Sequence, residues 1–191
     1  MVQTPSTMQA LGSAAPDFNL PEPATGNTVS LSEYRGQPLL VVFSCNHCPY
    51  VLHIIDAFVA VANAARERGL GVVMISANDV TGYPQDGPEP MAAFARDRGF
   101  DFPYLYDESQ QVAQAYQAAC TPDFFLYDTD HRLVYRGQFD GSRPGNSVPV
   151  DGADLSAAID AVMGGQAPTA EQVPSVGCNI KWRAGNEPDF A

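Results

Sequence analysis

The chain has 191 residues, of which 45% are hydrophobic and 17% charged, and this length suits one compact domain. Acidic residues outnumber basic ones by 22 to 10, which gives a net charge of −12 and a surface that repels nucleic-acid phosphates and anionic lipids. No apolar run approaches the ~20 residues of a membrane span. The first residues lack a signal-peptide pattern. We therefore expect a cytoplasmic protein with no nucleic-acid or membrane partner.

The predicted elements alternate between strands and helices along most of the chain. Two short strands over 18–20 and 28–31 flank a Pro/Gly turn, and the apolar run over 38–43 (PLLVVF) is typical of a strand buried on both faces. The later elements, in chain order, are a helix over 51–65, a strand over 72–76, a helix over 91–98, a strand over 103–106, a helix over 109–118, a hairpin of 124–127 with 133–135, and a helix around 155–162 with Asp151 or Asp154 as its N-cap.

This order of elements predicts an α/β fold with a mixed central sheet flanked by helices and an N-terminal β-hairpin. No linker divides the chain. We predict a flexible N-terminus over 1–14, one domain over 15–165, and a C-terminal tail over 166–191 packed on that domain.

Cys45 and Cys48 are separated by two residues where the buried strand becomes a helix. Unpaired N–H groups and the macrodipole at a helix N-terminus favour a thiolate, and the spacing brings the second sulfur within reach of the first. We predict Cys45 as the exposed nucleophile and Cys48 as the resolving thiol. A protonated His47 would lower the thiol pKa further. The alternative, a zinc site, typically takes two such cysteine pairs, and the chain has one.

Thr121 and Pro122 directly precede the strand that begins at Phe124. A proline at a strand entrance often only removes one ladder hydrogen bond. The functional interpretation is a cis Thr121–Pro122 bond whose Thr121 backbone pairs with an extended substrate, with Asp123 as a possible proton carrier.

The order of these features resembles the thioredoxin fold: a strand, the CxxC motif, a helix, and a Thr-Pro before the hairpin. The similarity extends over about 15–182 to a peroxiredoxin-like group of the alkyl hydroperoxide reductase/thiol-specific antioxidant family. It rests on the segments SLSEYRGQPLLVVFSCNHCPYV, ANDVTGYPQDGPEPM, FPYLYDESQQVAQAYQAACTPDFFLYD, RLVYRGQFDGSRPGN and PSVGCNIKW. The resemblance implies a thioredoxin-like fold, a redox-active Cys45/Cys48 pair and a cis Pro122.

The family's peroxidatic pattern, Pro-x-x-x-Thr-x-x-Cys, places Cys48 at the peroxidatic position, with Cys45 where the pattern has Thr and Val41 where it has Pro. Because a thiol replaces the Thr hydroxyl poorly, we predict a thiol–disulfide oxidoreductase first, acting on a protein or small-molecule disulfide. The alternative is a slow thiol peroxidase. A less favoured alternative is a copper or zinc thiolate-binding module using Cys45, Cys48 and His47 or His53. The expected reductant is of thioredoxin or glutathione type, and no cofactor is expected.

Two further cysteines lie outside the CxxC motif. Cys120, two residues before Pro122, is either a small buried hydrophobe or a third active-site thiol. Cys178 lies in the tail, which could fold back over Cys120 or Cys45. A Cys120–Cys178 disulfide is one possibility, and it requires Cα atoms closer than about 7 Å.

Overall fold

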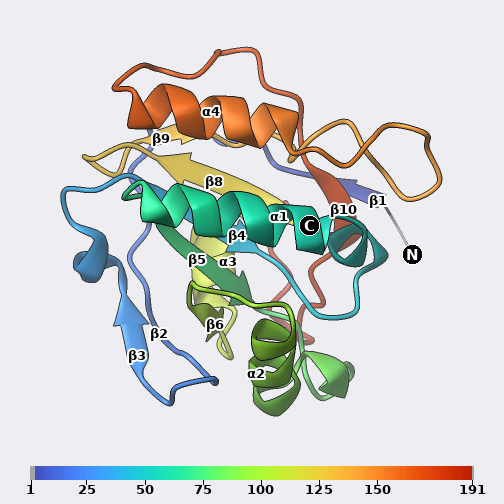
Figure 1. Cartoon of the computed structure of the whole chain (residues 1–191). Coiled ribbons are helices and arrows are strands. Elements are labelled where there is room, and N and C mark those ends of the chain that lie inside the picture. The colour runs from blue at the N-terminus through green and yellow to red at the C-terminus, as the bar shows by residue number, and fades with distance from the viewer. Residues whose placement is uncertain (1–2, 191) are drawn as a thin grey trace.

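The computed structural model describes residues 3–190 and is built around a five-stranded mixed sheet of order β6-β5-β4-β8-β9 (Figure 1). β4, β5 and β6 are parallel, whereas β8 is antiparallel to β4 and β9 is antiparallel to β8. The predicted α/β architecture with a mixed central sheet is confirmed. The strand bounds are Leu39–Phe43 for β4, Gly71–Ser76 for β5, Tyr104–Tyr106 for β6, Asp123–Tyr127 for β8 and Leu133–Tyr135 for β9.

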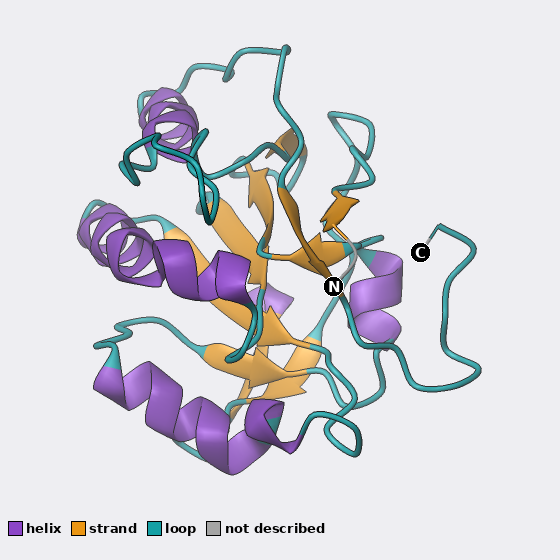
Figure 2. Ribbon diagram, turned by 90° about the vertical axis from the view of Figure 1, so that its right-hand side faces the viewer, coloured by secondary structure: helices purple, strands orange, loops and turns teal. Residues whose placement is uncertain are grey.

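Helices cover both faces of this sheet (Figure 2). On one face lie α1 (Pro49–Glu67), α2 (Pro88–Asp97) and α4 (Ala153–Met163). The other face carries the short α3 (Gln111–Ala115) and the hairpin of β2 (Asn19–Pro21) with β3 (Thr28–Ser30). Two 3₁₀ turns, Leu31–Tyr34 and Pro84–Asp86, complete the elements outside the strands.

β4 is apolar at every position because both of its faces are covered. Leu40 and Val42 pack in the core that contains α1, and Leu39, Val41 and Phe43 pack in the core on the opposite face. This division follows from the alternation of side chains along a strand. The end of β4 is thereby fixed between two cores, and the cysteine turn follows it directly.

A second sheet of order β1-β10-β7 forms beside the main sheet. Its central strand β10 (Val176–Asn179) pairs antiparallel with β7 (Cys120–Thr121) on one side and β1 (Gln3–Pro5) on the other. Residues 3–5 of the segment predicted to be flexible thus form a strand, and the tail contains a strand that the sequence pattern did not indicate. Strands of three or four residues are too short to show a clear alternation.

The start of α4 also differs from the prediction. Its N-cap is Gly152 rather than Asp151 or Asp154. Gly152 has a φ of +64°, and a Cβ atom at this position would lie 2.5 Å from the ring of Phe139, so the left-handed backbone and the close ring both favour glycine. Among the described residues, no helix is long and apolar enough to cross a membrane.

Candidate active site

The cysteine turn joins the end of β4 to the start of α1. Cys48 is the N-cap residue of α1 and Pro49 occupies the first helical turn, where its missing N–H costs little. The predicted exposure of Cys45 is wrong, because Cys45 is 1% exposed and Cys48 is fully buried. Both sulfurs face groups from distant parts of the chain instead of solvent.

Three sulfurs and one threonine meet at this point. The Sγ atoms of Cys48 and Cys178 are 2.9 Å apart. The Cys48 Sγ lies 3.1 Å from the carbonyl oxygen of Thr121, and the Cys45 Sγ lies 3.5 Å from the Thr121 hydroxyl. Cys48 is thus the central sulfur, with Cys45 and Cys178 as its neighbours.

The surroundings of Cys48 lower the pKa of its thiol to about 5. The largest cause is a hydrogen bond from Cys45, and further contributions come from Cys178, Thr121 and the backbone amide of Val51. Burial opposes ionisation, but the donors outweigh it because several converge on one sulfur.

The same contacts act in the opposite direction on the two neighbouring thiols. The hydrogen bond to Cys48, burial and the charge of Asp86 raise the pKa of Cys45 well above its ordinary value. Burial and the contact with Cys48 raise the pKa of Cys178 to about 12. These shifts favour Cys48 over Cys45 as the thiolate of the CxxC pair, and the roles of nucleophile and resolving thiol stay predictions.

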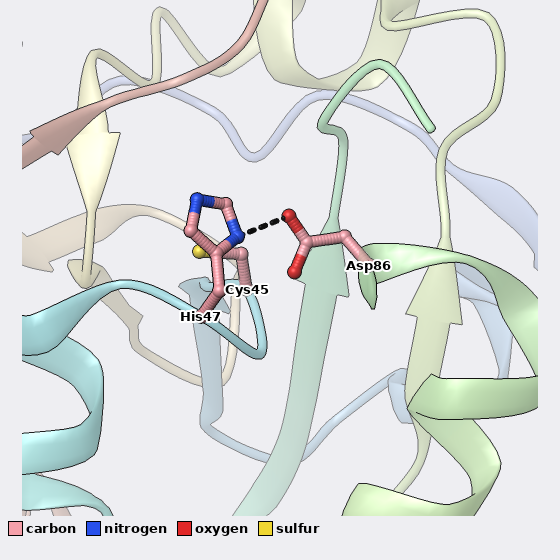
Figure 3. Close-up of side chains that lie close together, drawn as sticks. All are labelled: Cys45, His47 and Asp86. Carbon is pink, nitrogen blue, oxygen red and sulfur yellow. Dashed lines mark ion pairs between the residues drawn. The ribbon is translucent and has the colours of Figure 1, made fainter. Parts of the chain in front are cut away.

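Beside Cys45, the side chains of His47 and Asp86 point toward each other (Figure 3), with 2.7 Å between Nδ1 and Oδ2. Asp86 is fully buried. Its oxygens also accept hydrogen bonds of 2.8 Å from the Asn46 amide and the Asn78 side chain. Asp86 belongs to no motif in the sequence, because it lies in a turn far from the CxxC motif. The proposed effect of His47 on the thiol pKa stays a prediction.

Cys45, His47 and Asp86 are also the residues in which a metal ion could find ligands. Their ligand atoms all lie within 4.8 Å of one another, and a thiolate, an imidazole and a carboxylate form a donor set that zinc accepts. Both oxygens of Asp86 already accept hydrogen bonds within the protein. His53, the other histidine of the predicted metal module, contacts the Ser142 hydroxyl at 2.7 Å instead. Metal binding stays a prediction.

Tyr83, on the loop between β5 and α2, covers the site from one side. Its ring stacks on the imidazole of His47, with centroids 5.2 Å apart and planes 10° apart. The Nζ atom of Lys181 lies 5.7 Å from the centroid of the same ring. Because Lys181 follows β10, Tyr83 connects the CxxC turn with the tail.

The Thr121–Pro122 peptide bond is cis, as predicted. Thr121 is not open to an extended substrate, however, because β10 pairs with β7 and makes Cys178 the Cα partner of Thr121. The backbone edge that the sequence assigned to a substrate is occupied by the protein's own tail.

Cys120 and Asp123 lie behind the three sulfurs. The partner of Cys120 in β10 is Asn179, whereas Cys178 contacts Cys48, and the possible Cys120–Cys178 link stays a prediction. Burial and the charge of Asp123 raise the pKa of Cys120 well above its ordinary value. Burial likewise raises the pKa of Asp123 to about 7, while Asp123 accepts a hydrogen bond from the Ala119 amide at 3.1 Å. A part for Asp123 in proton transfer stays a prediction, as does the choice between the two interpretations of Cys120.

A buried cysteine at the start of the helix that follows the central strand, with two further cysteines beside it, is the site of a thiol oxidoreductase built on a thioredoxin-like fold. The chain belongs to the AhpC/TSA family, whose model matches residues 11–136. The predicted family and the prediction of an oxidoreductase are thereby confirmed.

Individual relatives fall into two named activities. Peroxiredoxin Bcp of Escherichia coli K12 is 29% identical over 132 residues, covering 68% of this chain and 80% of the relative. Thiol-disulfide oxidoreductase ResA of Geobacillus kaustophilus is 30% identical over 132 residues, covering 65% of this chain and 67% of the relative. The chain thus resembles proteins named for each of the two activities that the sequence predicted.

Solved structures extend the similarity beyond the family segment. A hypothetical protein from Sinorhizobium meliloti 1021 is 51% identical, has a TM-score of 0.93, and the match covers 95% of this chain and all of that one. The thioredoxin domain of a Bacteroides vulgatus thiol-disulfide oxidoreductase is 21% identical, has a TM-score of 0.57 and covers 67% of this chain and 88% of that one. The second likeness shows the shared thioredoxin-like fold.

Proposed function

We propose that this chain is a thiol–disulfide oxidoreductase in which the thiolate of Cys48 attacks the substrate. The observation that carries the proposal is the Cys48 sulfur, which lies at the first turn of α1, has a pKa of about 5 and has two thiols as neighbours. At neutral pH this sulfur is ionised, which is the form that attacks disulfides. The resemblance to ResA supports the same reaction class.

In this reaction the Cys48 thiolate attacks one sulfur of the substrate disulfide and releases the other as a thiolate. A neighbouring thiol then loses its proton and attacks Cys48 in the mixed disulfide, which releases the second half of the substrate. Forming the mixed disulfide removes the negative charge of Cys48, one cause of the raised pKa of Cys178. A reductant of thioredoxin or glutathione type in the cytoplasm returns the protein disulfide to two thiols.

A slow peroxidase activity is the second candidate, because Cys48 occupies the family's peroxidatic position and is ionised. A peroxide would oxidise Cys48 to a sulfenic acid and leave as an alcohol or water, and a second thiol would then condense with the sulfenic acid and release water. The reaction is slow because Cys45 replaces the hydroxyl-bearing residue of the family pattern. Stopped-flow peroxide consumption with a dimedone trap separates this activity from disulfide exchange.

The test of the main proposal is reduction of glutathione disulfide by the wild type and by Cys48→Ser, with Cys120→Ser as a matched control. Cys48→Ser should lose turnover by at least about 10³-fold, as expected when the nucleophile is removed. Cys120→Ser, a buried cysteine behind the site, should retain turnover. Turnover of the wild type no better than that of Cys48→Ser would refute the proposal.

A further inference from the structure

The tail strand β10 is held against the active site from both sides. Its Cys178 has Thr121 as Cα partner in β7 and Gln3 in β1. The hydroxyl of Ser175 donates a 2.6 Å hydrogen bond to the carbonyl oxygen of Pro122, and the carbonyl of Ser175 accepts one of 2.8 Å from the Ser6 amide. These bonds fix the position of Cys178 relative to the CxxC turn, although Cys178 is distant in sequence.

Gly177 permits β10 to approach Thr121 closely. A Cβ atom at Gly177 would lie 2.0 Å from the carbonyl oxygen of Thr121 and 2.6 Å from its carbonyl carbon. Because both atoms belong to the backbone, any larger residue must move β10 away from β7. Glycine at this position therefore keeps the neighbouring Cys178 beside Cys48.

We propose that β10 is a built-in disulfide partner, in which Cys178, rather than Cys45, closes the intramolecular disulfide with Cys48. This inference rests on the proposed function of Cys48 as the attacking thiolate. The two sulfurs are 2.9 Å apart, compared with about 2.05 Å in a disulfide bond, so bond formation needs only a small approach. Lys181, two residues beyond the end of β10, supplies a positive charge that favours the Cys178 thiolate.

The balanced reaction consumes one substrate disulfide and two protein thiols. The Cys48 thiolate breaks the substrate S–S bond, forms the mixed disulfide and releases one thiolate, which takes up a proton. The Cys178 thiol loses its proton and attacks the Cys48 sulfur, which forms the Cys48–Cys178 bond and releases the second thiolate. The substrate gains two electrons, and the two protein cysteines lose them.

The position of β10 also restricts the class of substrate. An extended polypeptide cannot pair with the backbone of Thr121 while Cys178 and Gly177 occupy that edge. A low-molecular-weight disulfide needs no such pairing and is therefore the suitable probe.

The experiment treats the full chain with hydroxyethyl disulfide, a small probe without a peptide backbone, and maps the disulfides by mass spectrometry of non-reduced peptides. The variants are Cys178→Ser, Cys45→Ser and the control Cys120→Ser. The wild type, Cys45→Ser and Cys120→Ser should yield the Cys48–Cys178 peptide pair. Cys178→Ser should accumulate the probe as an adduct on Cys48.

A second pair of variants tests the strand without removing a sulfur. Gly177→Ala should slow closure of the Cys48–Cys178 disulfide by up to about 100-fold, as for displacement of a reacting group by roughly 1 Å. Gly141→Ala is the control, because its Cβ would meet only a side-chain methyl of Val148 at 3.7 Å. Formation of Cys45–Cys48 in the wild type, with unchanged closure in Cys178→Ser, would overturn the inference and leave the proposed function intact. Absence of both a probe adduct on Cys48 and any disulfide that contains Cys48, in every protein, would overturn both.

Discussion

The two thiols that flank Cys48 lie in different electrostatic surroundings. On one side, the carboxylate of Asp86 adds to the hydrogen bond with Cys48 and to burial in raising the pKa of Cys45. On the other side, burial is the main cause of the raised pKa of Cys178, and the positive charge of Lys181 lowers it. The charge of Asp86 therefore disfavours an anion at Cys45, whereas the charge of Lys181 favours one at Cys178.

On the proposal that Cys178 closes the disulfide, closeness in sequence does not decide which thiol pairs with Cys48. Cys45 belongs to the same turn as Cys48, yet its environment holds the proton on sulfur. Cys178 comes from a separate sheet, where backbone pairing with β1 and β7 holds it beside the Cys48 sulfur. The CxxC spacing alone would assign the disulfide to Cys45 and Cys48.

The largest predicted effect is selective alkylation of Cys48 over both flanking thiols. With a pKa of about 5 for Cys48 and raised values for Cys45 and Cys178, the thiolate fraction at pH 7 should differ by more than about 100-fold. Limited iodoacetamide labelling followed by peptide mapping measures the ratio. The Cys48 label should rise with a midpoint near pH 5.

Cys120 is the internal control for this experiment, because it is buried and its pKa is raised well above the ordinary value. It should label only after unfolding. Equal labelling of Cys45 and Cys48 at pH 7 would contradict the distinction between the central sulfur and its neighbours.

The next effect is a pH dependence of stability that disappears with the Cys48 thiol. Its pKa falls from 9.0 to about 5 on folding, so between these values the unfolded state binds more protons and stability rises with pH. The contribution is complete above pH 9 and lost as the pH falls to 5. Relative to Cys48→Ser, the wild type should gain up to about 1.4 kcal/mol per pH unit in this window.

Urea unfolding at several pH values between 5 and 9 measures this difference. Asp123 contributes with the opposite sign, because its pKa is raised from 3.8 to about 7 on folding and its contribution is lost as the pH rises through that range. It is present in both proteins and cancels in the comparison. Parallel curves for the wild type and Cys48→Ser would show that Cys48 is not ionised in the folded protein.

The sequence was sufficient for the parts of the site that depend on local patterns. The apolar run of β4, the helical spacing of α1 and the CxxC motif placed the cysteine turn correctly, and the family resemblance implied the cis Pro122. Each of these follows from neighbours in the chain or from a motif.

The contacts between distant segments could not be predicted in the same way. β10 has four residues and no periodicity, and Asp86 lies in a turn. The low pKa of Cys48 could not be predicted, because it depends on donors such as Cys178, whose position is set by strand pairing. Spacing within a motif carries no information about such donors.

The smallest predicted effect comes from exchanging the charges on the two flanks. Asp86→Asn removes the negative charge beside Cys45 and keeps an oxygen that can accept the hydrogen bond from the Asn46 amide. It should raise the share of the Cys45–Cys48 disulfide by roughly three- to tenfold, which corresponds to a pKa decrease of up to about one unit for Cys45.

Lys181→Met should lower the share of Cys48–Cys178 by a similar factor, and Lys181→Arg, which retains the charge, should restore it. Peptide mapping after limited oxidation gives the ratio of the two disulfides. An unchanged ratio in both Asp86→Asn and Lys181→Met would mean that distance alone, and not the charge on either flank, selects the partner of Cys48.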